Sequence, residues 1–160
     1  MKNSAKGKST RGKVLSHNRK ATFNYKIEDT FEAGIALIGE EVKSSRLGGA
    51  NIADAYVGFD SLGMVLFNMN ISTYKYAQKN LTTSYDPTRN RRLLLHKKEI
   101  TKIQTRIKQK GGTVIPLKLY FNRRQKIKIE IAIAVGKKTH DKRATIKERD
   151  LAREARKENF

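Results

Sequence analysis

The stretch Ile127-Lys128-Ile129-Glu130-Ile131-Ala132-Ile133-Ala134-Val135 has the strictest apolar alternation in the chain. Successive side chains of a β-strand point to opposite faces of a sheet, so the odd-numbered residues of this stretch predict one buried face. Lys128 and Glu130 fall on the opposite face. The Lys128 side chain is therefore expected to project outward from a rigid strand.

A second strand is predicted directly before it, from Ile115 to Phe121. The residues Ile115, Leu117, Leu119 and Phe121 again alternate with others, and the polar residues 122–125 form a turn between the two stretches. The two strands therefore make a hairpin at the end of the folded body.

Alternation also marks the region from Phe23 to Leu37, where the odd-numbered residues are apolar except for Asp29. This pattern predicts one long strand, or two strands joined by a bend near Asp29-Thr30, with the odd-numbered face in the core. Two further strand-like segments, 52–59 and 64–71, flank a turn at 60–63 and form another hairpin.

Two helices are predicted between the strands. Residues 39–47 form a short helix with acidic residues in its first turn, and Gly48-Gly49 ends it. Its neighbours Glu40 and Glu41 point apart on a helix, which argues against a catalytic pair. A helix of about 14 residues follows His96 as N-cap with Glu99 at the third position, and Gly111-Gly112 ends it.

The polar segment 74–90 is predicted to be a loop, in which Tyr74, Tyr76 and Tyr85 either stack on nucleotide bases or pack on the rim of the body. The whole pattern predicts a mainly β fold. Its number of strands favours an antiparallel barrel of about six strands, similar to oligonucleotide-binding barrels, with two helices.

The charge of the chain indicates a polyanionic partner. Lys and Arg number 35 against 15 Asp and Glu, a net charge of +20, and nucleic acid is the commonest partner of such a protein. The charge is also segregated. Residues 1–20 hold seven basic and no acidic residues, 87–112 hold nine and one, and 21–86 hold five and eight. We therefore expect defined binding faces.

Several classes of protein are disfavoured. There is no cysteine for a disulfide or a thiolate metal site, and no stretch approaches the roughly 20 apolar residues of a membrane span. There is no glycine-rich phosphate loop, zinc-site spacing or Ser–His–Asp grouping, and His17, His96 and His140 lie in different predicted elements. We expect no metal, no cofactor, no enzymatic activity, no membrane contact and a cytoplasmic location.

Composition divides the chain into a basic N-terminal arm (1–20), an RNA-binding β-barrel domain (21–135) and a basic C-terminal tail (136–160). The arm is predicted to be solvated, with or without RNA contact. The tail is rich in helix formers from Thr145 onward, yet an isolated helix of this length is marginal in water. We expect it to be disordered when free and helical when bound to RNA.

Eight ordered motifs occur between His17 and Asp150. They are Asn18-Arg19-Lys20-Ala21, Phe31-Glu32-Ala33-Gly34-Ile35, Gly39 with Glu41-Val42-Lys43-Ser44, Ala50-Asn51-Ile52, Asp86-Pro87-Thr88-Arg89, Leu93-Leu94-Leu95-His96-Lys97-Lys98-Glu99-Ile100, Pro116-Leu117-Lys118-Leu119-Tyr120-Phe121, and Gly136-Lys137-Lys138 with His140-Asp141-Lys142-Arg143. In this order and spacing they resemble the SsrA-binding protein family, the partner of transfer-messenger RNA in bacterial trans-translation. Ser45 departs from the family, which more often has Leu there.

The resemblance implies a monomeric barrel that binds the tRNA-like domain of transfer-messenger RNA near its elbow. It implies that the tail enters the small subunit of a stalled ribosome, contacts its RNA, and occupies the decoding site and the empty mRNA channel. The nascent peptide is then tagged for proteolysis. Elongation factor Tu is a further partner implied for the delivery complex.

Matching positions imply roles for individual residues. Those implied to bind transfer-messenger RNA are Glu32, Leu94, His96 and Lys128, with Asn18, Arg19 and Lys20 assisting. Those implied to act in the tail are Gly136 as a hinge, Lys137, Lys138, Lys142 and Arg143 on ribosomal RNA phosphate, His140 stacked on a decoding-centre base, and Asp141 in the same motif. For two of these residues, the sequence alone leaves an alternative to RNA contact open. Leu94 could be buried in the core, and His96 could serve only as a helix cap.

Two other functions remain open from the residues alone. A structural ribosome component or general RNA chaperone would also be basic, but would show little preference for a tRNA-like elbow. A ribonuclease or RNA-modifying enzyme would turn over RNA.

Overall fold

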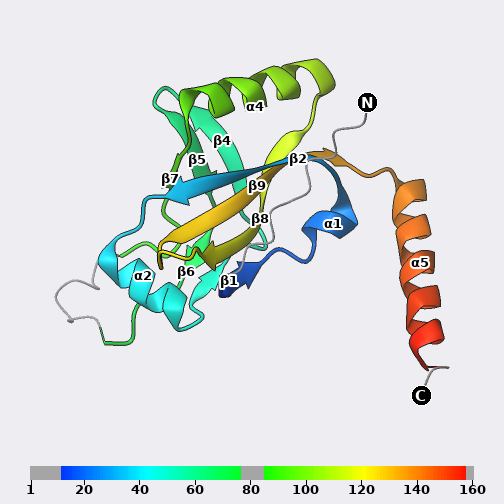
Figure 1. The fold of residues 1–160 in the computed structure, drawn as a ribbon, viewed down its shortest axis with the longest axis horizontal. Coiled ribbons are helices and arrows are strands. Elements are labelled where there is room, and N and C mark those ends of the chain that lie inside the picture. Colours follow the sequence, from blue (N-terminus) through cyan, green and yellow to red (C-terminus); the bar gives the residue numbers. More distant parts are fainter. Residues whose placement is uncertain (1–11, 77–84, 158–160) are drawn as a thin grey trace.

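A computed structural model describes residues 12–76 and 85–157, in which six antiparallel strands form a closed ring (Figure 1). The pairing of the first of these strands with the last closes the ring. In order around the ring, the strands are β8 (Thr113–Phe121), β4 (Tyr56–Asp60), β5 (Gly63–Phe67), β7 (Arg91–Leu94), β2 (Tyr25–Ile35) and β9 (Ile127–Gly136). The prediction of a mainly β, antiparallel fold of about six strands is confirmed, although β7 had no clear alternation in the sequence.

Within the described residues, three short strands lie outside the ring. β1 (Val14–His17) pairs with β8, while β3 (Ala50–Asn51) and β6 (Asn70–Ile71) form a separate two-stranded sheet. β1 falls within the segment 1–20 that the sequence assigned to an N-terminal arm. Residues 14–17 therefore belong to the folded body, and residues 1–11 of the expected arm lie outside the described residues.

Four helices are described where the sequence predicted two. The predicted pair are α2 (Gly39–Arg46) and the 14-residue α4 (Lys97–Lys110), and the additional pair are α1 (Ala21–Asn24) and α5 (Thr139–Lys157). α1 includes Phe23, which the alternation had placed in a strand. No helix among residues 12–76 and 85–157 is both long and apolar enough to span a bilayer.

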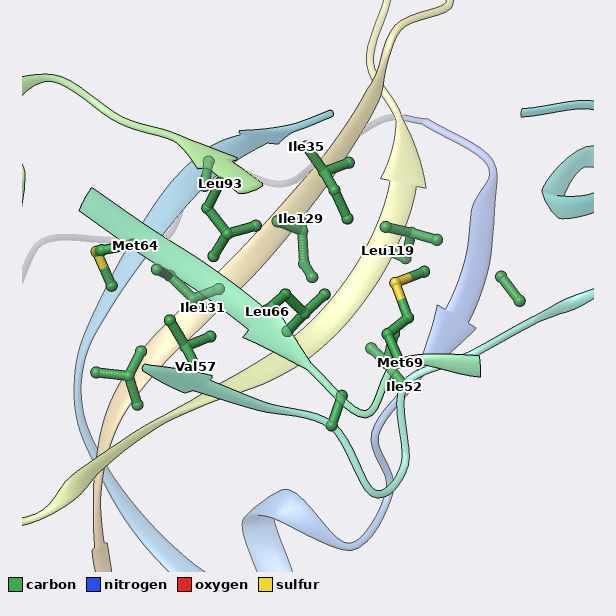
Figure 2. Close-up of a cluster of buried hydrophobic side chains, with 14 of the residues drawn as sticks. Ile35, Ile52, Val57, Met64, Leu66, Met69, Leu93, Leu119, Ile129 and Ile131 are labelled. Atoms are coloured by element: carbon green, nitrogen blue, oxygen red, sulfur yellow. The ribbon is translucent and has the colours of Figure 1, made fainter. Parts of the chain in front are cut away.

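The interior of the ring is filled by aliphatic side chains from all six strands (Figure 2). Ile129 and Ile131 of β9 are fully buried and Ile133 nearly so, which confirms the predicted inner face of that strand. Leu66 of β5 and Leu119 of β8 meet them from other strands. Each such side chain stabilises the fold by roughly 1.5–3 kcal/mol relative to an exposed one.

Two bulges change which face of a strand is buried. The register shifts between Ile27 and Asp29 in β2, and between Pro116 and Lys118 in β8. An extra residue at a bulge reverses the alternation beyond it. Ile27 and Ile115 consequently pack in a second, smaller cluster against Ala21 of α1 rather than inside the ring. The prediction that all odd-numbered residues of each strand share the core face was wrong at these positions.

Residues 139–157 of the tail form helix α5, whereas the sequence predicted disorder in the free protein. α5 begins at Thr139, six residues before the expected helix-rich segment, and extends away from the ring (Figure 1). Contacts with α1 and the residues beside it anchor it. The Lys137 backbone N–H donates to the Asn24 carbonyl (2.9 Å), and the Arg149 guanidinium carbon lies 5.5 Å from the centre of the Phe23 ring.

Candidate nucleic-acid interface

A cavity of about 570 Å³ lies where β2, β7 and β9 meet the N-terminus of α4. Its volume falls within the usual range of roughly 300–1,000 Å³ for small-molecule sites. Glu32, Leu94, His96 and Lys128 all line it, so the structure brings together the four residues that the family resemblance singled out. The other lining residues are Leu62, Gly63, Arg92, Leu93, Leu95, Glu99 and Ile100.

Cross-strand register explains why residues so distant in sequence converge. Leu94 is the partner of Gly34, Gly34 is the partner of Lys128, and Lys128 is the partner of Tyr120, which makes one row across β7, β2, β9 and β8. Directly opposite side chains in a sheet lie about 4.5–5.5 Å apart at their Cβ atoms. Glu32 lies in the next row, two residues along β2, on the same outer face.

Leu94 is exposed, with 58% of its surface accessible, whereas its neighbour Leu93 is 4% exposed and belongs to the ring core. The alternative that buried Leu94 in the core is therefore wrong. Gly34 makes room for this arrangement, because a Cβ at position 34 would lie 3.1 Å from the Leu94 Cβ. Leu94 thus crosses over the bare backbone of β2 and offers an apolar surface to the cavity.

The backbone and the side chain of His96 are placed differently. His96 is the N-cap of α4, and its backbone N–H donates a hydrogen bond to Glu99 Oε2 at 3.0 Å. The capping prediction is confirmed, and it concerns the His96 backbone. The exposed imidazole lines the cavity, so capping and contact with a ligand do not compete for the same atoms.

The charges around Glu32 are arranged in pairs. The Tyr120 hydroxyl donates a hydrogen bond to Glu32 Oε2, while Lys118 Nζ lies 2.8 Å from Glu130 Oε2 in the same row as Glu32. Burial and the neighbouring Glu32 carboxylate raise the pKa of Tyr120, so its hydroxyl keeps its proton at neutral pH. Lys128 makes no ion pair with the described residues, and its ammonium remains for an anion.

The Asn18-Arg19-Lys20 motif lies elsewhere. Asn18 is 5% exposed, and its side chain donates to the Pro116 carbonyl (3.1 Å) and accepts from the Ala21 backbone N–H (3.1 Å). It therefore fixes the turn between β1 and α1. Lys20 lies 3.5 Å from Asp54 beside a second cavity of about 500 Å³, and the structure does not bring this motif to the cavity around Glu32.

The tail residues form the junction between the ring and α5. Gly136 is the last residue of β9, and Lys137 Nζ donates to the Thr22 carbonyl at 2.9 Å and lies 3.3 Å from Thr145 Oγ1. The remaining predicted residues follow this junction as one segment. Lys138 is exposed before α5, and His140, Asp141, Lys142 and Arg143 fall in its first two turns.

Sequence reasoning missed a buried ionic cluster beneath β7. Arg91 is completely buried and donates through Nε (3.0 Å) and Nη2 (2.8 Å) to Glu41 Oε1, and Arg89 donates to Glu41 Oε2 at 2.6 Å. Tyr85 packs here, with its hydroxyl donating to the Ile71 carbonyl at 2.9 Å. Arg91 shares the parity of buried Leu93, and this was the signal that could have revealed it.

Burial by itself would raise the pKa of Glu41. Hydrogen bonds from Arg89 and the Ile38 backbone, together with the charge of Arg91, outweigh burial and lower the pKa below its usual value. Glu41 therefore works as a structural anion that joins α2 to β7, the strand that carries Leu94. Among the described residues, no group of three or more His, Asp and Glu side chains is placed to hold a metal ion.

The chain is similar to proteins of one known family. The SsrA-binding protein of Zymomonas mobilis is 49% identical over 144 residues, covering 90% of this chain and 88% of the relative, and that of Chlorobaculum tepidum is 51% identical over 137 residues, covering 86% and 85%. A solved structure reported as "tmRNA-SmpB: a journey to the center of the bacterial ribosome" aligns with a TM-score of 0.62 and 41% identity, covering 77% of this chain and 84% of that one. A family model described as SmpB protein matches residues 15–159, and the chain therefore belongs to the SmpB protein family.

Proposed function

We propose that the protein is an RNA-binding adaptor for ribosome rescue. It binds the tRNA-like domain of transfer-messenger RNA through the cavity around Glu32 and delivers that RNA to stalled ribosomes for trans-translation. Its tail then occupies the decoding site and the empty mRNA channel. It acts by binding two RNAs, without catalysing a reaction, in the compartment that holds ribosomes. Its relatives of similar length are named SsrA-binding proteins, and its solved relative is described with transfer-messenger RNA and the ribosome.

The observation that carries this proposal is the convergence of Glu32, Leu94, His96 and Lys128 on one cavity. Together these side chains offer three kinds of contact to RNA. The Lys128 ammonium binds a phosphate and fixes the register of the RNA. Leu94 and the His96 imidazole pack on the face of a base, and the Glu32 carboxylate accepts from a base N–H or a ribose hydroxyl.

The shape of the site favours a nucleotide that is not stacked in a helix. The deep major groove of A-form RNA excludes side chains, so sequence- and structure-specific proteins bind loops whose bases are unstacked. A cavity with an apolar wall and a few polar groups suits such a base. A loop region of a tRNA-like domain is therefore the expected target of the cavity.

The tail has a separate task. Residues 136–160 hold nine basic and five acidic residues, which suits contact with ribosomal RNA phosphate. Among the described residues, the tail contacts the body at few places: Lys137, just before α5, bonds to Thr22 and Asn24 through its side chain and backbone, and Arg149 of α5 lies against Phe23. So sparse an attachment can be released when the tail enters a channel in the ribosome.

A binding titration with the full-length chain tests this division of labour. The ligands are the isolated tRNA-like domain and an ordinary tRNA, at two salt concentrations, with Lys128→Ala and Leu94→Ala as cavity variants and His140→Ala as the tail variant. Cavity variants should weaken binding to the tRNA-like domain. His140→Ala should leave that binding nearly intact and abolish tagging of a stalled nascent peptide.

The same titration separates the proposal from its rival. Equal, steeply salt-dependent binding to both RNAs, with no effect of the cavity variants, would identify a general RNA chaperone that binds phosphate without selecting a fold. Cleavage or modification of either RNA by the purified protein would identify an enzyme.

A further inference from the structure

Tyr120 lies on β8, next to Lys128 in the row that crosses the outer face of the ring. Tyr120 is only 2% exposed, and its hydroxyl donates to Glu32 Oε2. The second oxygen of that carboxylate, Oε1, has no hydrogen-bond donor among the residues that the structure describes. We propose that Tyr120 is a positioning residue for RNA binding, which holds the Glu32 carboxylate in place so that Oε1 accepts a hydrogen bond from the RNA.

The reasoning starts from the freedom of a glutamate side chain. Glu32 is exposed on β2, and without a partner its carboxylate would sample several rotamers. A side chain that is ordered only on binding loses that freedom at the moment of contact. This loss weakens an interaction by about 2- to 12-fold per immobilised side chain. A donor that is itself buried and rigid removes the loss, because the carboxylate is ordered before the RNA arrives.

The neighbours of Tyr120 keep its hydroxyl on Glu32. Glu130 is the cross-strand partner of Glu32, and like charges opposite each other in a sheet repel. Lys118 Nζ forms an ion pair with Glu130 Oε2 at 2.8 Å, and the same ammonium lies 5.9 Å from the centre of the Tyr120 ring. The charge of Glu130 is thus matched within its own strand pair, and the tyrosine hydroxyl is directed to Glu32 alone.

The test is a double-mutant cycle on RNA binding, and it rests on the proposed function. The full-length variants are Tyr120→Phe, Glu32→Ala and the two together, titrated with the tRNA-like domain. Tyr120→Phe removes one oxygen and keeps the buried ring. Tyr56→Phe is the matched control, because Tyr56 is an exposed tyrosine of β4 that lies outside the cavity. Unfolding midpoints of all variants separate loss of binding from loss of fold.

We expect Tyr120→Phe to weaken binding by about 3- to 10-fold. In the Glu32→Ala background it should cause no further loss, and Tyr56→Phe should change nothing. A merely structural role for Tyr120 would instead produce the same loss in both backgrounds, and that result would overturn the inference. The inference also fails if Glu32→Ala weakens binding while Tyr120→Phe does not, and the proposed function then stands.

If neither Glu32→Ala nor any other cavity variant weakens binding, both the inference and the proposed site fail together. A second ligand identifies the donor on the RNA. When the loop riboses lack their 2′-hydroxyl groups, persistence of the coupling between Tyr120 and Glu32 supports a base N–H as donor, and loss of the coupling supports a ribose hydroxyl.

Discussion

Glu41→Gln should strongly destabilise this protein, although it replaces only one carboxylate oxygen by an NH2 group. The substitution keeps the size of the side chain but removes the negative charge that is ion-paired with both Arg89 and Arg91, and the Arg91 side chain is 0% exposed. Breaking a buried ion pair by removing one partner typically costs about 3–5 kcal/mol, because the remaining charge is left uncompensated. For a domain of this size that corresponds to a fall in melting temperature of about 6–20 °C.

The assay is urea and thermal unfolding followed by circular dichroism, with Glu40→Gln as the matched control. Glu40 is the adjacent residue of α2 and makes no ion pair within the described part of the chain, so its change should stay within about 0.5 kcal/mol. A Glu41→Gln protein within about 1 kcal/mol of the parent would refute the reasoning, since the cluster would then contribute little.

Acid should remove the difference between the parent and Glu41→Gln. The folded pKa of Glu41 lies below the ordinary value of 4.5, so the stability that its charge contributes is present above pH 4.5 and is lost as the pH falls through the folded pKa. The double variant Glu41→Leu/Arg91→Met should recover part of the stability, as buried ion pairs often tolerate apolar replacement. Recovery should be incomplete, because the carbonyl oxygens of Met69, Arg89 and Pro87 lose the donors of Arg91.

Three further predictions concern the surface. Lys128→Ala should weaken RNA binding and reduce the slope of log affinity against log salt by about one, and an unchanged slope would reject the phosphate contact. Leu94→Ala should weaken RNA binding while changing the free energy of unfolding by less than about 0.5 kcal/mol, whereas Leu93→Ala, the buried control, should cost about 2–5 kcal/mol in urea unfolding. Arg149→Ala should speed amide hydrogen exchange in α5, because it removes the contact with Phe23, while exchange in the six strands stays the same. Equal exchange of α5 in both proteins would show that this contact does not hold the helix.

Much of the ring could be predicted because its strands alternate strictly. The ring core contains Ile129, Ile131 and Ile133, with Ile127 packed against it, and periodicity alone identifies this face of β9. Periodicity failed at Ile27 and Ile115, because a bulge adds a residue to one strand and leaves no mark in the order of apolar residues. β7 was missed because it is only four residues long and begins with two arginines, so it shows no apolar alternation.

The candidate site was predictable in a different way. Outward exposure of Glu32 and Lys128 follows from strand parity, but their nearness to Leu94 and His96 depends on which strands become neighbours. Local patterns do not determine that order, and the family resemblance supplied the set of four. The assisting role implied for Asn18 stays a prediction, and the structure adds that its side chain bonds to Pro116 and Ala21 within the fold.

The length of α5 makes it a lever. Its 19 residues form a rod of about 28 Å that is joined to the ring just beyond Gly136. A rotation of roughly ten degrees at that joint moves the far end by about 5 Å, or nearly one helical turn. A small change in the hydrogen bond from Lys137 Nζ to the Thr22 carbonyl therefore produces a larger displacement at the far end of α5. The position of the C-terminal end of α5 is therefore determined by the few contacts near its N-terminal end, between the end of β9 and α1.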